Sequence, residues 1–133
     1  MYCSSYGSVN HEDNTWLIDS GASKHMSGYK ETFTDLVMKD SSRKVRLGDD
    51  RPCSIKGKGT TSYKLISSRQ LKMEDVLFVP ELKRNLLTIS RLEKKGFKVA
   101  FANGEVLIWP KGKTIEDADV IGIHEDGLYK LIG

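Results

Sequence analysis

The sequence predicts a mainly β protein with a single helix. Three observations support this prediction: the apolar runs are short, turn-forming residues separate them at close intervals, and only one stretch has helical periodicity. The 133 residues are enough for one compact domain and too few for two of ordinary size. Hydrophobic residues make up 38% of the chain and charged residues 29%, a composition typical of a folded domain.

The first ordered element is predicted shortly after residue 14. Residues 1–14 are polar and have no periodicity, so we expect a flexible lead-in followed by one domain at residues 15–133. The apolar run at residues 16–18 stops at the tripeptide Asp19-Ser20-Gly21. This pattern predicts a buried strand that runs into a turn.

A hairpin is predicted in the middle of the chain. Residues 44–47 alternate between apolar and polar side chains as a strand does, and residues 52–58 return after a turn signal, which places the hairpin tip at 48–51. Gly57 and Gly59 lie within the returning strand. They indicate a kink or the close approach of another backbone segment.

The remaining elements are three strand pairs and the helix. The helix is predicted from Asn85, because the apolar residues from there to Leu92 fall on one helical face, and it ends at Gly96. The strand pairs are predicted at residues 62–67 with 71–79, at 97–102 with 105–109 around Asn103-Gly104, and at 120–124 with 127–131.

Composition argues against several classes of protein. The net charge of +3 is small and the basic residues are scattered, whereas nucleic-acid binders have a denser basic surface. No apolar run approaches the roughly 20 residues of a membrane span, and no signal peptide is visible, so we expect an intracellular domain or one cut from a longer chain. Cys3 and Cys53 form no CxxC pair, and no metal site or cofactor is expected. A single disulfide between them is conceivable, but in a reducing compartment free thiols are the expectation.

The most informative motif is Asp19-Ser20-Gly21-Ala22-Ser23, which follows the predicted buried strand. A strand that is buried up to Ile18 would deliver the carboxylate of Asp19 to the floor of a cleft. Ser20 offers a short hydroxyl for a hydrogen bond that fixes the loop, and Gly21 lets the backbone turn. His25 and Met26 further along are expected to be loop and packing residues.

The sequence resembles the protease segment of copia-type retrotransposon polyproteins, which are relatives of the retroviral proteases. The resemblance extends from about residue 15 to residue 131, with the same order and spacing of motifs. Its landmarks here are Trp16-Leu17-Ile18-Asp19-Ser20-Gly21-Ala22-Ser23-Lys24-His25-Met26, Val45-Arg46-Leu47-Gly48-Asp49-Asp50, Ile55-Lys56-Gly57-Lys58-Gly59, Asp75-Val76-Leu77-Phe78-Val79-Pro80-Glu81-Leu82, Asn85-Leu86-Leu87-Thr88-Ile89-Ser90 and Gly127-Leu128-Tyr129-Lys130-Leu131.

The resemblance implies a retropepsin-like fold, a closed β-barrel of the acid-protease type, with a flap hairpin and one C-terminal helix that begins near residue 84. It implies catalytic roles for Asp19, Ser20 and Gly21. It also implies substrate contacts from the motif loop and from the flap, namely Gly21, Ala22, Ser23, Leu47, Gly48, Asp49 and Asp50. Two departures from the retroviral pattern are the acidic flap tip and the pair Ser23-Lys24, where the retroviral enzymes carry two acids.

A single aspartate implies a homodimer. Aspartic protease chemistry needs two carboxylates that share a proton, and the chain has only one Asp-Ser/Thr-Gly tripeptide. The second carboxylate is therefore expected from Asp19 of another copy across a two-fold axis. By resemblance, the expected protein is an aspartic endopeptidase that processes a Gag-Pol polyprotein in the cytoplasm, within a virus-like particle, without a cofactor or membrane contact.

Two alternatives stay open at this point. One is a non-catalytic binding or assembly module of the same fold, to which the acidic flap tip points. The other is a nucleic-acid-binding β-domain, which the slight basic excess suggests although no stripe of aromatic and basic residues is visible. Residues 103–133 either complete the domain, including its dimer interface, or begin the next segment of the polyprotein.

Overall fold

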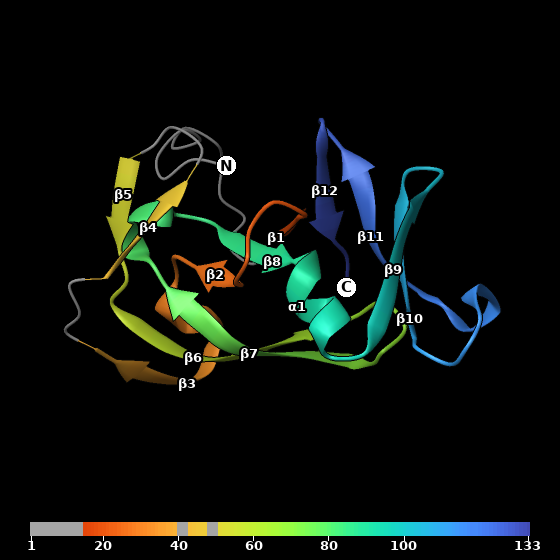
Figure 1. The fold of residues 1–133 in the computed structure, drawn as a ribbon, viewed down its shortest axis with the longest axis horizontal. Coiled ribbons are helices and arrows are strands. Elements are labelled where there is room, and N and C mark those ends of the chain that lie inside the picture. Colours follow the sequence, from red (N-terminus) through yellow and green to blue (C-terminus); the bar gives the residue numbers. More distant parts are fainter. Residues whose placement is uncertain (1–14, 40–42, 48–50) are drawn as a thin grey trace.

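The computed structural model describes residues 15–39, 43–47 and 51–133 (Figure 1). These residues form one ten-stranded sheet, in the order β3-β6-β7-β2-β8-β1-β12-β11-β10-β9, and a separate two-stranded sheet, β4-β5. The strands are β1 (Trp16–Asp19), β2 (Met26–Ser27), β3 (Phe33–Met38), β4 (Lys44–Leu47), β5 (Arg51–Ser54), β6 (Gly57–Lys64), β7 (Gln70–Phe78), β8 (Asn85–Thr88), β9 (Phe97–Ala102), β10 (Glu105–Pro110), β11 (Asp119–Glu125) and β12 (Leu128–Leu131). The helices are α1 (Ile89–Lys94) and the 3₁₀ turns η1 (Lys30–Thr32), η2 (Pro80–Leu82) and η3 (Ile115–Asp117).

The mainly β class is therefore confirmed, but the closed barrel is not found. In the described part of the chain, β3 and β9 are the two edges of the large sheet and do not pair with each other. Residues 97–133 add four antiparallel strands that extend the sheet beyond β1, so the sheet ends at the edge strand β9 and does not close on β3.

The centre of the sheet has a symmetric pattern of pairing. β1 lies parallel to β8, β2 lies parallel to β7, and β2 joins β8 in the antiparallel sense. The segment from β1 to β2 therefore makes the same kinds of contact as the segment from β7 to β8. This arrangement buries β8 completely, since all four of its residues are buried.

The predicted helix is wrong in its first part. Residues 85–88 form strand β8, and α1 covers only Ile89–Lys94. Leu86 and Leu87 point to opposite faces of β8 and are both fully buried, so β8 is covered on both faces. Such a strand has apolar residues in succession and lacks the usual alternation of apolar and polar residues. A short apolar run of this kind cannot be distinguished from a helix by its periodicity.

The predicted hairpins agree better with the structure. β6 and β7 form the second predicted pair, β9 and β10 the third, and β11 and β12 the fourth. Asn103 and Gly104 both have positive φ, 53° and 77°, as their turn requires. The first pair is β4 with β5, so the returning strand ends at Ser54, earlier than expected. β2 and β3 were not predicted.

The prediction of a close approach at Gly59 is confirmed. A Cβ atom at this position would lie 2.1 Å from the backbone oxygen of Asp35 on β3. The register of β3 against β6 shifts between Phe33 and Asp35, and that of β6 against β7 shifts between Gly59 and Thr61. Gly59 therefore allows β3 to bend closely over β6.

Two groups of buried apolar residues form the core. The larger group lies between α1 and the strands on either side and includes Ile18, Leu87 and Leu131. The smaller group packs beneath the β4–β5 hairpin and includes Leu17 and Cys53. Burial of Leu131 in the larger group shows that β12 packs into the same core as β1.

Cys53 is 1% exposed and disulfide-bonded, so the expectation of free thiols is wrong. That expectation rested on the reducing compartment expected for the domain, and the separation of two cysteines along the chain does not exclude their contact in space. The predicted lead-in at residues 1–14 lies outside the described residues. Among those that are described, no helix has the length and apolar character needed to cross a membrane.

Candidate active site

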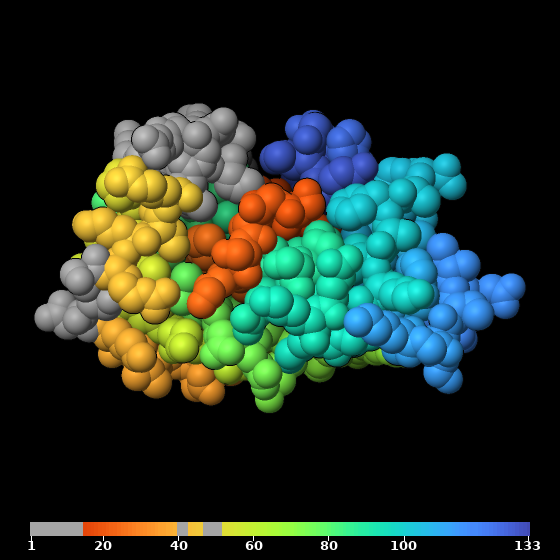
Figure 2. Space-filling model, in the orientation of Figure 1, coloured from red at the N-terminus to blue at the C-terminus, as the bar shows by residue number. Residues whose placement is uncertain are grey.

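Asp19 lies at the end of β1, where the strand leaves the sheet. β1 runs between β8 and β12, and Asp19 is the direct neighbour of Thr88 on β8. Trp16, Leu17 and Ile18 are buried, whereas Asp19 is half-buried and the next two residues are exposed. The buried strand thus delivers one carboxylate to the surface, and the predicted place of Asp19 at the floor of a substrate cleft stays a prediction. Figure 2 shows the red-orange segment that follows β1 at the surface, between the yellow β4–β5 strands and α1.

The carboxylate of Asp19 is held by its own loop. The backbone N–H of Gly21 donates a hydrogen bond of 2.8 Å to Asp19 Oδ1. Ser20 and Ser23 are exposed, and Ala22 packs against the smaller core group together with Val45 of β4. The predicted motif residues are therefore gathered in one exposed loop, with the β4–β5 hairpin above the same apolar group.

The flap residues are only partly described. Leu47 ends β4, but its side chain lies outside the described part of the structure, as do Gly48, Asp49 and Asp50 entirely. Their predicted substrate contacts remain predictions. The hairpin itself is tied down at its base, because the N–H of Ser54 donates to the Glu81 carboxylate at 3.2 Å.

The loop that follows Asp19 is anchored to β8 by a residue that the sequence did not single out. Thr88 is fully buried, its hydroxyl donates to the carbonyl oxygen of Ala22 at 2.5 Å, and its N–H donates to His25 Nδ1 at 3.0 Å. His25 is 3% exposed, and its carbonyl accepts the N–H of Leu77 at 3.0 Å. No sign of this role for Thr88 is visible in the sequence, because residues 85–88 were predicted to be helical and not to lie beside β1.

His25 has an unusual pKa for a histidine. Burial, together with the positive charges of Arg91 and Lys95, lowers its pKa from 6.5 to about 4. The hydrogen bond from the N–H of Thr88 requires an unprotonated Nδ1, so it favours the same neutral form. The imidazole is therefore neutral throughout the weakly acidic range.

This pKa predicts a loss of stability in acid. The unfolded chain binds the His25 proton near its ordinary pKa and the folded chain only near 4, so the free energy of unfolding should fall as the pH falls from 6.5 to 4. The expected loss from this one group is about 3 kcal/mol. Urea unfolding of the wild type and of His25→Asn, measured at several pH values, isolates the contribution. If the free energy of unfolding depended on pH in the same way for both proteins, His25 would not be the cause of the loss of stability.

The pairing symmetry of the sheet identifies the segment equivalent to the Asp19 loop. That segment follows β7 and contains Pro80–Leu82, the 3₁₀ turn η2. The acidic residue of this segment is Glu81, whose carboxylate accepts a hydrogen bond from the N–H of Ser54. In the part of the chain that the structure describes, this equivalent segment therefore supplies no second aspartyl loop. Among the described residues, no group of three or more His, Cys, Asp or Glu side chains is arranged to hold a metal ion.

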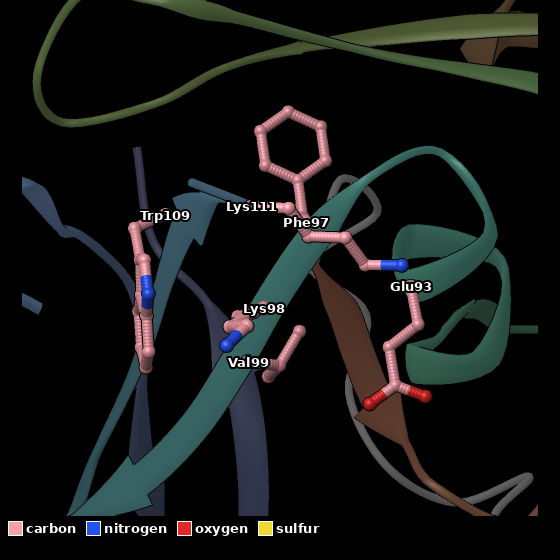
Figure 3. Close-up of a pocket in the computed structure, with 6 residues that line it drawn as sticks. All are labelled: Glu93, Phe97, Lys98, Val99, Trp109 and Lys111. Carbon is pink, nitrogen blue, oxygen red and sulfur yellow. The ribbon is translucent and has the colours of Figure 1, made fainter. Parts of the chain in front are cut away.

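Two surface cavities lie away from Asp19. The larger, of about 470 Å³, lies between α1 and the β9–β10 hairpin and is lined by Glu93, Phe97, Lys98, Val99, Trp109 and Lys111 (Figure 3). The smaller, of about 300 Å³, is lined by Asp35, Lys58, Gly59, Thr60, Glu74 and Asp75. Neither contains a residue of the aspartyl loop, so neither is the predicted substrate site.

Comparison with known proteins shows the family. The family model described as "Pol polyprotein, beta-barrel domain" matches residues 16–97, more than half of the chain. The chain belongs to the Pol polyprotein β-barrel domain family. The matched region of this Pol β-barrel domain runs from the first residue of β1 to the first residue of β9 and so includes Asp19, His25 and Thr88.

The Pol β-barrel domain is also similar to plant retrotransposon polyproteins. It is 30% identical over 91 residues to the retrovirus-related Pol polyprotein from transposon TNT 1-94 of Nicotiana tabacum, covering 68% of the chain and 7% of that polyprotein. It is 30% identical over 95 residues to the Pol polyprotein from transposon RE1 of Arabidopsis thaliana, covering 68% and 6% respectively.

A third relative is the Pol polyprotein from transposon RE2 of Arabidopsis thaliana, which is 32% identical over 79 residues and covers 59% of the chain and 5% of the polyprotein. The Pol β-barrel domain thus spans less than a tenth of the length of these relatives. The resemblance to a copia-type Pol region is confirmed. No solved structure matches this chain.

Proposed function

We propose that this domain is an aspartic endopeptidase that cleaves within a retrotransposon Gag-Pol polyprotein, and that it acts as a homodimer with Asp19 from each copy. The observation that carries the proposal is the geometry of Asp19. A buried strand ends at this carboxylate, the N–H of Gly21 donates to one of its oxygens, and Ser20, Gly21 and Ser23 of the loop are exposed. A carboxylate placed in this way is accessible to a peptide and to a second copy of itself.

The chemistry requires two such carboxylates close together. One of them, ionised, removes a proton from a water molecule that attacks the scissile carbonyl carbon. The other, protonated, donates a hydrogen bond to the carbonyl oxygen and stabilises the charge that develops there. Two like charges about 3 Å apart cannot both be present, so the pair shares one proton and titrates as a unit.

Two observations support the need for a second chain. The segment equivalent to the aspartyl loop, after β7, carries Glu81, which is bonded to β5. The sequence contains no second Asp-Ser/Thr-Gly. In the proposed dimer, a two-fold axis passes between two copies of the loop at residues 19–24, and the extended substrate lies between this floor and the β4–β5 hairpins.

The test is peptidase activity as a function of protein concentration. Active sites made by two copies predict that activity per mole of chain rises with concentration and reaches a plateau as sedimentation shows dimer formation. Pepstatin, which mimics the tetrahedral intermediate of aspartic proteases, should abolish the activity. Tight peptide binding without cleavage, in a dimer at about pH 5, would instead indicate the non-catalytic binding module.

A further inference from the structure

One buried ionisable side chain has no part in the chemistry described above. His25 lies six residues after Asp19, is 3% exposed, and contacts the strand beside the candidate catalytic residue. We propose that His25 is a positioning residue, which as a neutral hydrogen-bond acceptor holds the aspartyl loop on β8 and thereby fixes Asp19 where the catalytic pair must form. The inference rests on the proposed function.

The first step of the argument is the direction of the hydrogen bond. A backbone N–H can only donate, so the bond of 3.0 Å from Thr88 N requires a lone pair on His25 Nδ1. The proton of the neutral ring is then on Nε2. Protonation of Nδ1 would place two donors against each other and leave the buried N–H of Thr88 without its acceptor.

The second step is the place of Thr88 in the sheet. Thr88 is the direct neighbour of Asp19 in the parallel pairing of β1 with β8. Its hydroxyl reaches the carbonyl oxygen of Ala22, in the middle of the loop, and its N–H reaches His25, at the end of the loop. One residue therefore fixes the loop at its beginning, middle and end. His25 supplies the last of these three attachments.

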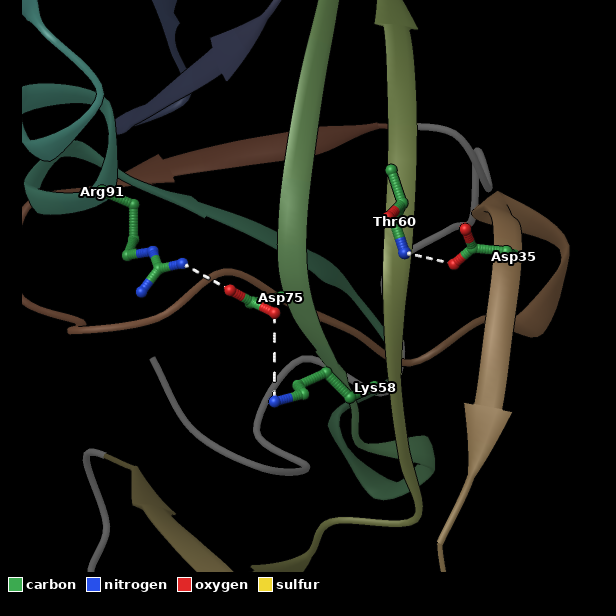
Figure 4. A network of polar contacts seen from close by, with 5 residues as sticks. All are labelled: Asp35, Lys58, Thr60, Asp75 and Arg91. Carbon is green, nitrogen blue, oxygen red and sulfur yellow. Dashed lines mark hydrogen bonds and ion pairs between the residues drawn. The ribbon is translucent and has the colours of Figure 1, made fainter.

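The third step concerns the charges around the imidazole. Burial is the main cause of the lowered pKa of His25, and Arg91 and Lys95, from α1 and its C-terminal cap, lower it further. Both cations form ion pairs with β7: Arg91 Nη2 lies 3.2 Å from Asp75 Oδ2, and Lys95 Nζ lies 3.2 Å from Glu74 Oε1. Figure 4 shows Asp75 between Arg91 and Lys58 in this network.

The charges nearest to His25 along the loop are Lys24, which directly precedes it, and Asp19 itself. Burial of the imidazole and the positive charges around it together lower the pKa of His25, and this keeps the ring neutral in weak acid. An aspartate pair that shares one proton works in that same range. The anchor is thus preserved under the conditions in which the proposed reaction takes place.

The test compares two substitutions that differ in one property. In His25→Asn, Oδ1 replaces Nδ1 as the acceptor and cannot titrate; in His25→Leu, the acceptor is lost. At pH 6, His25→Leu should lower kcat about 100-fold with little change in KM, since a displacement of the catalytic group of about 1 Å has an effect of this size. The kcat of His25→Asn should stay within about threefold of the wild-type value. In the wild type, protonation of His25 should lower kcat as the pH falls towards 4, and His25→Asn should not show this decrease.

A second pair of variants tests the charges. Arg91→Gln removes a cation that lowers the pKa of His25, so this pKa should rise. The decrease of kcat in acid should then begin at a higher pH. Lys58→Gln is the matched control, because Lys58 also contacts Asp75, at 3.9 Å, yet does not act on the pKa of His25. If the pH at which kcat decreases were unchanged in Arg91→Gln, or shifted equally in both variants, the proposal would be overturned.

A readout without turnover separates this inference from the proposed function. Amide exchange at Gly21 and Thr88 should accelerate at least about tenfold in His25→Leu and stay near the wild-type rate in His25→Asn. If the wild type does not cleave peptides but this pattern holds, the proposed function fails and the anchor stands. If both variants exchange as the wild type does, or if both accelerate equally, His25 does not position the loop.

Discussion

Replacing Asp19 by Asn should abolish peptide cleavage while leaving the protein folded. The side chain is half-buried, and an Asn Oδ1 can still accept the hydrogen bond from Gly21 N, so the loop keeps its shape. The amide can neither remove a proton from water nor donate the carboxylic proton. In a homodimer both of these roles are lost together, and loss of general acid–base catalysis lowers kcat by about 10²- to 10⁴-fold. Cleavage assays and thermal unfolding of the purified variant measure the two effects.

Asp126→Asn is the matched control for this substitution. Asp126 is exposed in the β11–β12 turn, where φ is 55° and Asn is well suited, so activity should be unchanged. Mixing wild type with Asp19→Asn adds a test of the shared site. If the copies pair at random, the fraction of fully wild-type dimers is the square of the wild-type fraction. The activity of the mixture should therefore fall more steeply than in proportion to the wild-type fraction. Cleavage that persists in the purified Asp19→Asn protein would exclude Asp19 as the catalytic group.

Gly59→Ala should produce the largest loss of stability among substitutions that add one methyl group in the β3–β6 region. The added Cβ would lie 2.1 Å from the backbone oxygen of Asp35, and backbone cannot move aside as the end of a side chain can. Overpacking of this kind destabilises a protein by about 3 kcal/mol. Urea unfolding at neutral pH gives the free energy of unfolding of both proteins.

Ser62→Ala is the control for the glycine substitution. Ser62 is exposed on the same strand, β6, so its replacement should change the free energy of unfolding by less than about 0.5 kcal/mol. Equal unfolding curves for Gly59→Ala and Ser62→Ala would show that β3 does not pack closely on β6 at Asp35.

Much of the fold could be predicted from local patterns. The buried strand before Asp19 and the turns at Asn103 and Gly127 are encoded by residues next to one another in the chain, and the structure has them. β8 was mistaken for helix, because double-sided burial removes the alternation that identifies a strand. β2 contains two residues, Met26 and Ser27, which is too short for any periodicity.

The candidate site was predictable only where its parts adjoin in sequence. The loop from Asp19 to Ser23 is continuous, and its motif identified it. The contact of His25 with Thr88 joins residues that are 63 positions apart, and it depends on the pairing of β1 and β2 with β8. No local pattern contains that information. The position of β12 beside β1 likewise depends on long-range pairing, and the sequence left the role of residues 103–133 open.

The flanking of β1 by β8 and β12 restricts how two copies could assemble. Both backbone edges of the strand that bears Asp19 are already occupied, so a second copy cannot join it by strand addition. The lateral edges of the large sheet are β3 and β9, each several strands away from Asp19, and contact there would separate the carboxylates. In the proposed homodimer, association would therefore occur head to head, through turns. A compound that mimics an extended strand would then be a poor inhibitor of assembly, whereas a ligand shaped to the exposed turn at Ser20 and Gly21 would compete directly.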